Sequence, residues 1–247
     1  MEFSLLFAAL MGMLAMWAML WWEAKRGNAA DCARNLWDVA LTAAVVGLFV
    51  GRLAAMIGDG VNPLTNPKDI IIIRGGVATG WASLAAMTTV AVMGGRERRI
   101  VADGLSAAAL AGLAGWHSGC LARDACLGTS SDLPWALTQE GSAVTRHPVE
   151  LYAAVLLAIG AFGLAAWKAR GRPPLGAPAA AALAIAGGVR LVTEPMRLAL
   201  STGPVLWYWA ALLVGTAALI ILLWRKRISS AATAATPPAQ PERRAGP

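Results

Sequence analysis

The side chains best suited to catalysis gather in one stretch of the chain, residues 115–152. It holds both histidines, His117 and His147, and two of the three cysteines, between long apolar segments that have few such groups. Imidazole titrates near neutral pH, so either histidine can accept a proton or donate a hydrogen bond. This concentration of polar chemistry predicts a site in residues 115–152.

Three arginines lie inside apolar segments: Arg52, Arg74 and Arg190. An ionised side chain in hydrocarbon is costly, and it usually faces a partner or a water-filled cavity. Glu194 follows Arg190 by four residues, which places both on one face of a helix. The pair by itself fits a structural ion pair as well as a binding site. Several arginines at one level favour an anion, and the phosphate of a lipid headgroup suits their bidentate geometry.

Residues 146–152, with the sequence RHPVELY, are expected to begin a helix near the membrane surface. Pro148 fits the first turn of a helix because its missing N–H is not needed there. Glu150 and the ring of Tyr152 are expected near the interface, where tyrosine is enriched. His147 fits a capping role or, if the site is near the surface, that of a base. His117 lies near the outer end of another helix, where it can act as a base or as a hydrogen-bond donor.

The cysteines leave one question open. Cys120 and Cys126 lie six residues apart and would point in different directions on a continuous helix, so a disulfide requires the helix to end between them. An oxidising outer compartment permits such a bridge, and packed, unbridged cysteines are the alternative. Neither cysteine forms a zinc-binding spacing with His117, so we predict no metal site and no cofactor. Cys32, in a connection assigned to the cytoplasm, is expected to be a free thiol.

The composition indicates which elements must position these groups. Hydrophobic residues make up 57% of the 247-residue chain and charged residues 14%, with a mean hydropathy of +0.58. These values are typical of an integral membrane protein. Apolar segments of about 20 residues can cross the hydrocarbon core as helices, and they lack the alternation of barrel strands. We expect seven such segments, at residues 3–22, 36–57, 70–93, 101–121, 148–167, 176–199 and 203–224.

The predicted fold is an all-α polytopic membrane bundle of about seven transmembrane helices. Residues 107–115 and 179–188 are rich in Gly and Ala, which let helix backbones approach closely, so these segments are expected in the bundle interior. We divide the chain into a transmembrane domain, residues 1–227, and an Ala- and Pro-rich cytoplasmic tail, residues 228–247, that is predicted to be disordered.

The basic residues predict the orientation. Lys and Arg concentrate in the first, third and fifth connections and in the tail. By the positive-inside rule these parts are cytoplasmic, which places the N-terminus outside and the C-terminus in the cytoplasm. The net charge of +7 follows from this bias, so it does not indicate a nucleic-acid partner.

Several short motifs occur in an order that resembles one family. They are Gly51-Arg52-Leu53, Gly75-Gly76 through Gly80, Asp132-Leu133-Pro134-Trp135, Arg146-His147-Pro148, Leu151-Tyr152 and Arg190 through Glu194 to Arg197. Over residues 36–224 the chain resembles prolipoprotein diacylglyceryl transferase, a bacterial enzyme that moves a diacylglyceryl group from phosphatidylglycerol to a cysteine of a lipoprotein precursor. The most specific combination is RHPxxLY followed further along by RxxxE.

The resemblance implies a multi-pass enzyme of the bacterial cytoplasmic (inner) membrane. Its partners would be phosphatidylglycerol, the signal peptide of a lipoprotein precursor and membrane lipids. The reaction needs a base for the thiol and cations for the departing phosphate. The candidate catalytic residues are His117, Arg74 and His147, and the candidate lipid phosphate-binding residues are Arg146, Arg190, Glu194, Arg197 and Tyr152. Glu194 is expected to hold Arg190 in place.

Two positions depart from the family pattern. Where the family has His-Gly-Gly, this chain has Arg74-Gly75-Gly76, and where the family has Arg followed three residues later by Asn, it has His117 and Cys120. An Arg and a His have thus exchanged places, and one cavity would still receive an imidazole and a guanidinium. One alternative is a non-catalytic paralogue that binds an anionic lipid or a membrane partner in the same cavity. Another is a small-solute transporter, which the lack of a recognisable inverted repeat disfavours.

Overall fold

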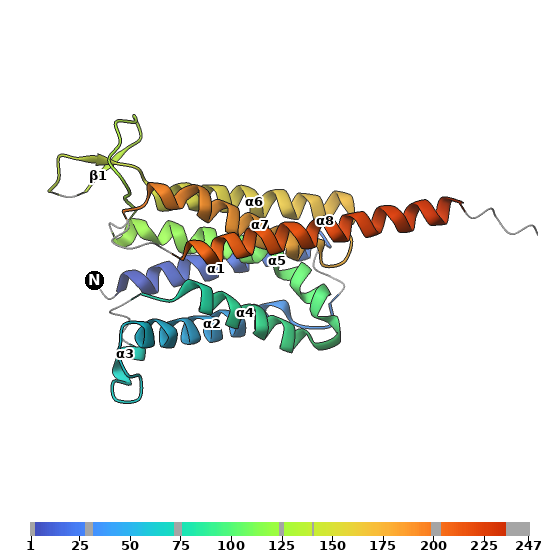
Figure 1. The fold of residues 1–247 in the computed structure, drawn as a ribbon, viewed down its shortest axis with the longest axis horizontal. Helices are drawn as coiled ribbons and strands as arrows, with labels where there is room; N and C mark the ends of the chain where they lie inside the picture. The colour runs from blue at the N-terminus through green and yellow to red at the C-terminus, as the bar shows by residue number, and fades with distance from the viewer. Residues whose placement is uncertain are drawn as a thin grey trace, which may run out of the picture.

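The computed structural model describes residues 3–27, 32–71, 76–123, 126–139, 141–198 and 204–235. In these ranges the long helices lie side by side in one elongated bundle (Figure 1). They are α1 (Phe3–Lys25), α2 (Leu36–Gly58), α4 (Thr79–Gly94), α5 (Arg98–Ser118), α6 (Val149–Gly171), α7 (Ala177–Thr193) and α8 (Val205–Ala235). The connections hold a short helix α3 (Lys68–Ile71), three 3-10 turns, η1 (Gly95–Glu97), η2 (Gly119–Arg123) and η3 (Glu194–Met196), and an antiparallel hairpin of β1 (Leu137–Thr138) and β2 (Thr145–Arg146).

The described helices define a polytopic membrane protein. Five of those in the described ranges are long and apolar enough to cross a membrane by length and composition: α1, α2, α6, α7 extended by η3, and α8. α4 has only 16 residues, and the first turns of α5 carry Arg98, Arg99 and Asp103. Each long helix overlaps one of the predicted segments, while the number that cross the membrane and their orientation stay predictions.

Helix α5 occupies the centre of the bundle, where it packs against α1, α2, α4, α6 and α7. Its small residues permit this: Ala107 and Ala108 have no exposed surface, and a Cβ added at Gly115 would overlap the carbonyl oxygen of Met11 in α1. Because α5 is covered largely by protein rather than by lipid, it tolerates polar residues that a lipid-facing helix does not. The interior placement predicted for residues 107–115 is confirmed for most of the segment.

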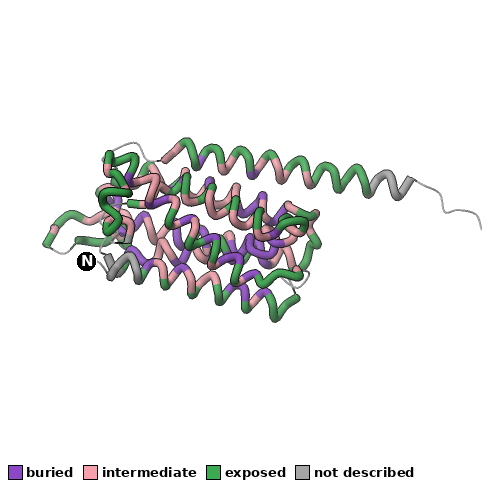
Figure 2. The backbone as a smooth tube through the Cα atoms, turned by 90° about the horizontal axis from the view of Figure 1, so that it is seen from below, coloured by how far each residue is buried: buried purple, intermediate pink, exposed green. Residues whose placement is uncertain are grey.

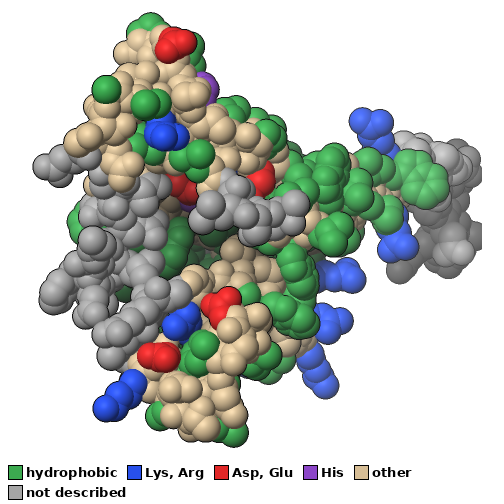
Figure 3. All heavy atoms as spheres, turned by 60° about the vertical axis from the view of Figure 1, so that its left-hand side comes forward, with side chains coloured by type: hydrophobic (Ala, Val, Ile, Leu, Met, Phe, Trp, Pro, Cys, Tyr) green, Lys and Arg blue, Asp and Glu red, His purple; other side chains and the backbone are tan. Residues whose placement is uncertain are grey.

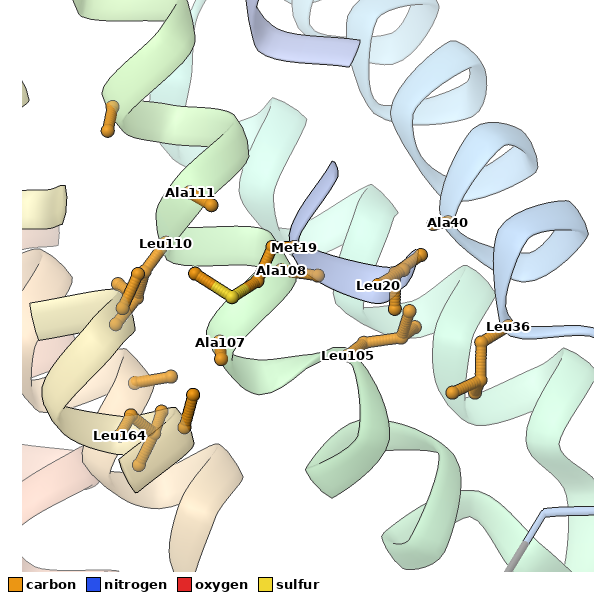
Figure 4. Close-up of a cluster of buried hydrophobic side chains, with 14 of the residues drawn as sticks. Met19, Leu20, Leu36, Ala40, Leu105, Ala107, Ala108, Leu110, Ala111 and Leu164 are labelled. Atoms are coloured by element: carbon orange, nitrogen blue, oxygen red, sulfur yellow. The ribbon is translucent and has the colours of Figure 1, made fainter. Parts of the chain in front are cut away.

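A cluster of buried apolar side chains surrounds α5. Those labelled in Figure 4 are Met19 and Leu20 of α1, Leu36 and Ala40 of α2, Leu105, Ala107, Ala108, Leu110 and Ala111 of α5, and Leu164 of α6. In a bilayer such contacts gain from close packing rather than from removal of water, so the alanines matter as much as the leucines. Figure 2 shows the buried segments inside the bundle and the exposed ones along the projecting end of α8.

Helices α7 and α8 pack through glycines on both partners. A Cβ added at Gly187 would lie 2.6 Å from the carbonyl oxygen of Tyr208, and one at Gly215 would lie 2.7 Å from that of Ala180. Real Cβ atoms do not approach so closely, so the two backbones meet only because these positions are glycine. The interior packing predicted for residues 179–188 is thus confirmed, and it brings Tyr208, which is 6% exposed, against α7.

The prediction of one continuous helix over residues 70–93 is wrong. Helices α3 and α4 are separate, and residues 76–78 before α4 are not helical. Arg52 of α2, 5% exposed, donates hydrogen bonds to the carbonyl oxygen of Asp69 at 3.0 and 2.9 Å and to that of Gly76 at 3.1 Å. This buried guanidinium binds one carbonyl oxygen in α3 and one in the non-helical residues before α4, which stabilises the break, and glycine has a low helix propensity.

Two helix ends also differ from the prediction. Helix α7 ends at Thr193 rather than near residue 199, because Pro195 lacks the N–H that would continue it, and η3 follows. Helix α8 continues to Ala235, past residue 228, where the disordered tail was predicted to begin. The stretch before Ala235 is rich in Ala, the residue with the highest helix propensity.

The first, third and fifth connections, which the sequence shows to be rich in Lys and Arg, lie at one end of the bundle, opposite the hairpin (Figure 1), and we call this the basic end. A buried ion pair joins α1 to α6 there: Lys168 Nζ lies 2.8 Å from Glu23 Oε1, and these side chains are 6% and 0% exposed. Asp103 of α5 accepts the N–H groups of Gly176 at 2.6 Å and Ala179 at 3.0 Å, at the start of α7. These contacts fix the positions of α1, α5, α6 and α7 along the bundle axis. They therefore also determine which side chains lie at the same level at the opposite end of the bundle.

Candidate functional site

Charged side chains from three helices and η3 meet at the end of the bundle opposite the basic end. His117 lies in the last turn of α5, Glu150 in the first turn of α6 and Arg190 in the last turn of α7, while Glu194 begins η3 and Arg197 follows it. We call these five residues the polar cluster. The side chains are 10 to 15% exposed, except that of Arg197 at 38%. Charges buried to this degree must pair, and they do.

Glu150 is the centre of the polar cluster. Its Oε2 lies 2.5 Å from His117 Nδ1 and 3.6 Å from Arg190 Nη1, and its Oε1 lies 3.3 Å from Arg197 Nε. An ionised carboxylate only accepts hydrogen bonds, so the proton of the short contact belongs to His117 Nδ1. In a neutral imidazole this leaves the lone pair on Nε2, which is the form required of a general base.

Glu194 binds the same two arginines. Its Oε2 lies 3.4 Å from Arg190 Nη2 and 3.3 Å from Arg197 Nη1, so the predicted contact between Arg190 and Glu194 is confirmed. Arg190 Nη2 also lies 3.4 Å from the hydroxyl oxygen of Tyr208, and the guanidinium carbon is 5.3 Å from the centre of that ring. Tyr208 therefore supports the Arg190 head from α8.

In the polar cluster, two guanidiniums face two carboxylates beside the imidazole of His117. Burial by itself lowers the pKa of Arg197, but Glu150 and Glu194 outweigh it and raise that pKa above its usual value. Arg190 Nη1 is buried and makes no hydrogen bond, which leaves a donor for a ligand oxygen. An incoming anion thus meets two fixed cations that already have carboxylate partners.

A second group of side chains lies beside the hairpin. Trp135 Nε1 donates a hydrogen bond to the hydroxyl of Tyr152 at 2.8 Å, and that hydroxyl lies 3.4 Å from His147 Nδ1. The rings of His147 and Tyr152 meet edge to face, with centres 6.1 Å apart. Within the described part of the chain, no hydrogen bond or ion pair links these three side chains to the polar cluster. The structure thus separates the environments of the two histidines.

Arg146 lies at the base of the hairpin, where its Nη1 donates to the carbonyl oxygen of Gly128 at 3.3 Å. The N–H of Gly128 donates to the carbonyl oxygen of His147 at 2.7 Å, and the N–H of Thr129 donates to that of Met196 at 2.8 Å. The hairpin is thereby tied to η3, which carries Glu194 and precedes Arg197. Arg146 binds a backbone carbonyl oxygen, whereas the cluster arginines bind carboxylates, and its role as a phosphate ligand stays a prediction.

Cys120 and Cys126 form a disulfide, the arrangement that the sequence left open. The condition for it is met, because α5 ends at Ser118 and η2 follows. The carbonyl oxygen of Cys126 accepts the N–H of Glu150 at 3.4 Å, so the bridged loop touches the first turn of α6 at the central carboxylate. Cys32 is a free thiol, as predicted.

Arg74 lies outside the described residues, so its proximity to His117 stays a prediction. On either side of it in the sequence, the carbonyl oxygens of Asp69 and Gly76 accept hydrogen bonds from the guanidinium of Arg52. Arg52 therefore anchors the connection before α4, close in sequence to Arg74, and does not enter the polar cluster.

Glu150 and Tyr208 are candidate functional residues that the sequence reasoning missed. Within RHPVELY, the arginine, histidine and tyrosine carry the motif, and Glu150 resembles an interfacial residue. The sequence feature that could have identified Glu150 is its position in the first turn of an apolar helix, where a carboxylate needs a cationic partner. Which cations it meets depends on how three helices pack. Tyr208 is one of two tyrosines in the chain and had no local signal.

Figure 3 shows the end of the molecule that carries the polar cluster. A hollow lies between the part with the hairpin and the part with α3, and acidic and apolar side chains appear along it. Apolar side chains beside a few charged groups are typical of pockets that bind small molecules.

The fold and the site define a polytopic helical membrane protein with an imidazole, carboxylate and guanidinium network at one end. Residues 3–224 match the family model described as prolipoprotein diacylglyceryl transferase, and the chain belongs to that family. The predicted resemblance is thereby confirmed, and with it, at the level of the family, prolipoprotein diacylglyceryl transfer and a place in lipoprotein biosynthesis. No curated protein matches the chain.

Proposed function

We propose that this protein transfers a diacylglyceryl group from phosphatidylglycerol to the lipobox cysteine thiol of a lipoprotein precursor, at the outer face of the bacterial cytoplasmic membrane. The observation that carries the proposal is the contact between His117 Nδ1 and Glu150 Oε2, flanked by Arg190 and Arg197. It joins a base to two cations at one end of the bundle, and thiol alkylation with departure of a phosphate needs both.

His117 is the proposed base. Its Nε2 takes the proton of the cysteine thiol while Glu150 stabilises the resulting imidazolium through Nδ1. The thiolate attacks the glyceryl carbon that bears the phosphate ester, a C–S bond forms, and the C–O bond breaks. Glycerol phosphate leaves with the electron pair of that bond. His147, which contacts Tyr152 rather than a carboxylate, is the second candidate for the base.

Arg190 and Arg197 are the proposed ligands of the leaving phosphate. When His117 becomes an imidazolium, Glu150 gains a third cationic neighbour, and its charge is shared among more partners. The two guanidiniums are then less fully compensated at the moment when negative charge develops on the phosphate. Proton uptake by the base and stabilisation of the leaving group are coupled through this one carboxylate.

Three further residues complete the proposed phosphate site. Arg146 lies at the base of the hairpin, and Tyr152 lies near the start of α6, where its hydroxyl accepts a hydrogen bond from Trp135. We include Arg74 because of the exchanged motif positions. The same exchange favours one alternative: a family relative that binds an anionic lipid in this cavity without transferring it. That alternative predicts lipid binding without turnover.

Incubation of the purified protein with labelled phosphatidylglycerol and a lipobox peptide tests the proposal. We expect the label on the peptide, none on a peptide with Ser in place of the lipobox Cys, and rescue of a strain depleted of its own transferase. The matched control variant is Arg225→Gln, an exposed change on α8 at the basic end, which should transfer lipid like the parent. Retained lipid without any labelled peptide, from a folded protein, would favour the non-catalytic alternative.

A further inference from the structure

A cavity of about 270 Å³ lies at the basic end, far from the polar cluster. Its lining comes from η1, the first turn of α5 and the turn before α7, and consists of Arg96, Glu97, Arg98, Arg99, Ile100 and Leu175. Gly95 precedes this stretch with φ +52°, a left-handed conformation that turns the chain sharply after α4. The turn places three arginines around one hollow.

These arginines have no acidic partner in the described part of the chain, where no ion pair involves Arg96, Arg98 or Arg99. The nearest acid of α5, Asp103, has both oxygens engaged by the N–H groups at the start of α7. Glu97 lines the cavity too, but it is one carboxylate against three guanidiniums, and its Oε2 lies 4.0 Å from Cys32 Sγ. The hollow therefore keeps an excess of positive charge.

The apolar part of the lining distinguishes the kind of anion. Leu175 is 50% exposed beside the arginines, and Ile100 is half-buried next to it. The contacts of Asp103 with the start of α7 hold the turn that bears Leu175 against α5. Arginines beside an exposed leucine, at the ends of apolar helices, suit a ligand whose phosphate and acyl chains lie side by side.

We propose that this cavity binds the phosphate headgroup of an anionic phospholipid in the cytoplasmic leaflet. The guanidiniums hold the phosphate oxygens, and Leu175 with Ile100 contacts the glyceryl and first acyl carbons. The site is separate from the one proposed for transfer, and it does not depend on that function.

Purified, delipidated protein titrated with cardiolipin, with thermal unfolding and native mass spectrometry as readouts, tests this site. Cardiolipin should stabilise the protein and remain bound, whereas phosphatidylcholine and inorganic phosphate should not. The triple variant Arg96→Gln, Arg98→Gln, Arg99→Gln should lose at least about tenfold in apparent affinity. The matched control, Arg170→Gln, Arg225→Gln, Arg227→Gln, removes as many exposed charges from the same end and should lose less than about threefold.

A second variant is needed because removal of three arginines from a connection can impair insertion of the protein into the membrane. Leu175→Glu keeps all three arginines and adds a carboxylate at an exposed position, so it should insert normally and reduce cardiolipin affinity at least as much as a single arginine change. Equal losses in the pocket and control triple variants would overturn the proposal in favour of diffuse attraction. Equal protection by inorganic phosphate would overturn it in favour of a soluble anion. Unchanged cardiolipin affinity in Leu175→Glu would also overturn it.

Discussion

Replacement of Glu150 by Gln should separate catalysis from folding in the polar cluster. The change keeps the shape of the side chain but removes the charge that meets His117 at 2.5 Å, Arg197 at 3.3 Å and Arg190 at 3.6 Å. The amide can donate its own N–H to His117 Nδ1, which moves the imidazole proton to Nε2 and removes the lone pair that accepts the thiol proton. Loss of a positioned base costs about 10²–10⁴ in rate, so we expect kcat to fall by that factor.

The expected loss of stability is smaller than the geometry alone suggests. Removing one partner of a buried ion pair costs about 3–5 kcal/mol when the other charge is left unpaired. Here Glu194 still binds Arg190 and Arg197 at 3.4 and 3.3 Å, so the free energy of unfolding should fall by less than that range. The unfolding midpoint in detergent should drop by a few degrees, and the variant should still bind phosphatidylglycerol.

Glu194→Gln is the matched control. It removes a carboxylate from the same two arginines but does not touch His117, so its kcat should fall much less than that of Glu150→Gln. Single-turnover transfer of labelled lipid to a lipobox peptide measures both variants, and thermal unfolding verifies that they fold. The reasoning is refuted if Glu150→Gln transfers lipid within about threefold of the parent, because a base oriented by a carboxylate cannot be so insensitive to its loss.

Three further predictions concern the exchanged motif, the topology and the packing. His117→Ala should abolish transfer with lipid binding retained, and the double change Arg74→His with His117→Arg should keep more activity than either single reversion; normal transfer by the alanine variants of both positions would make the exchange incidental. A reporter fused after Arg227 should be active only in the cytoplasm and one inserted in residues 124–139 only outside, and a reversed result would remove the outer-face site. Gly187→Val should push α8 away from α7 and lower the free energy of unfolding by about 1–3 kcal/mol, and thermal unfolding unchanged from the parent would contradict the close packing.

The helices were predictable because their signal is local. A run of about 20 apolar residues has to satisfy its backbone within itself, so each long helix appears where such a run occurs. The small residues of α5 and α7 likewise indicate close helix packing, and the contact between Arg190 and Glu194 follows from a spacing of four residues on one helix. Each of these inferences needs only neighbours along the chain.

The interruptions and the centre of the site were decided by tertiary structure. Arg52 stabilises the break before α4 through carbonyl oxygens 17 and 24 residues away, and no local pattern specifies that partnership. His117 and Glu150 meet across 33 residues, and the sequence offered two histidines for one role without indicating which faces a carboxylate. The relative heights of α5, α6 and α7, which the contacts of Lys168 and Asp103 hold at the basic end, determine that choice at the opposite end. A charged residue in an apolar helix predicts that an oppositely charged or polar partner exists, but only the packing of the helices determines which residue that partner is.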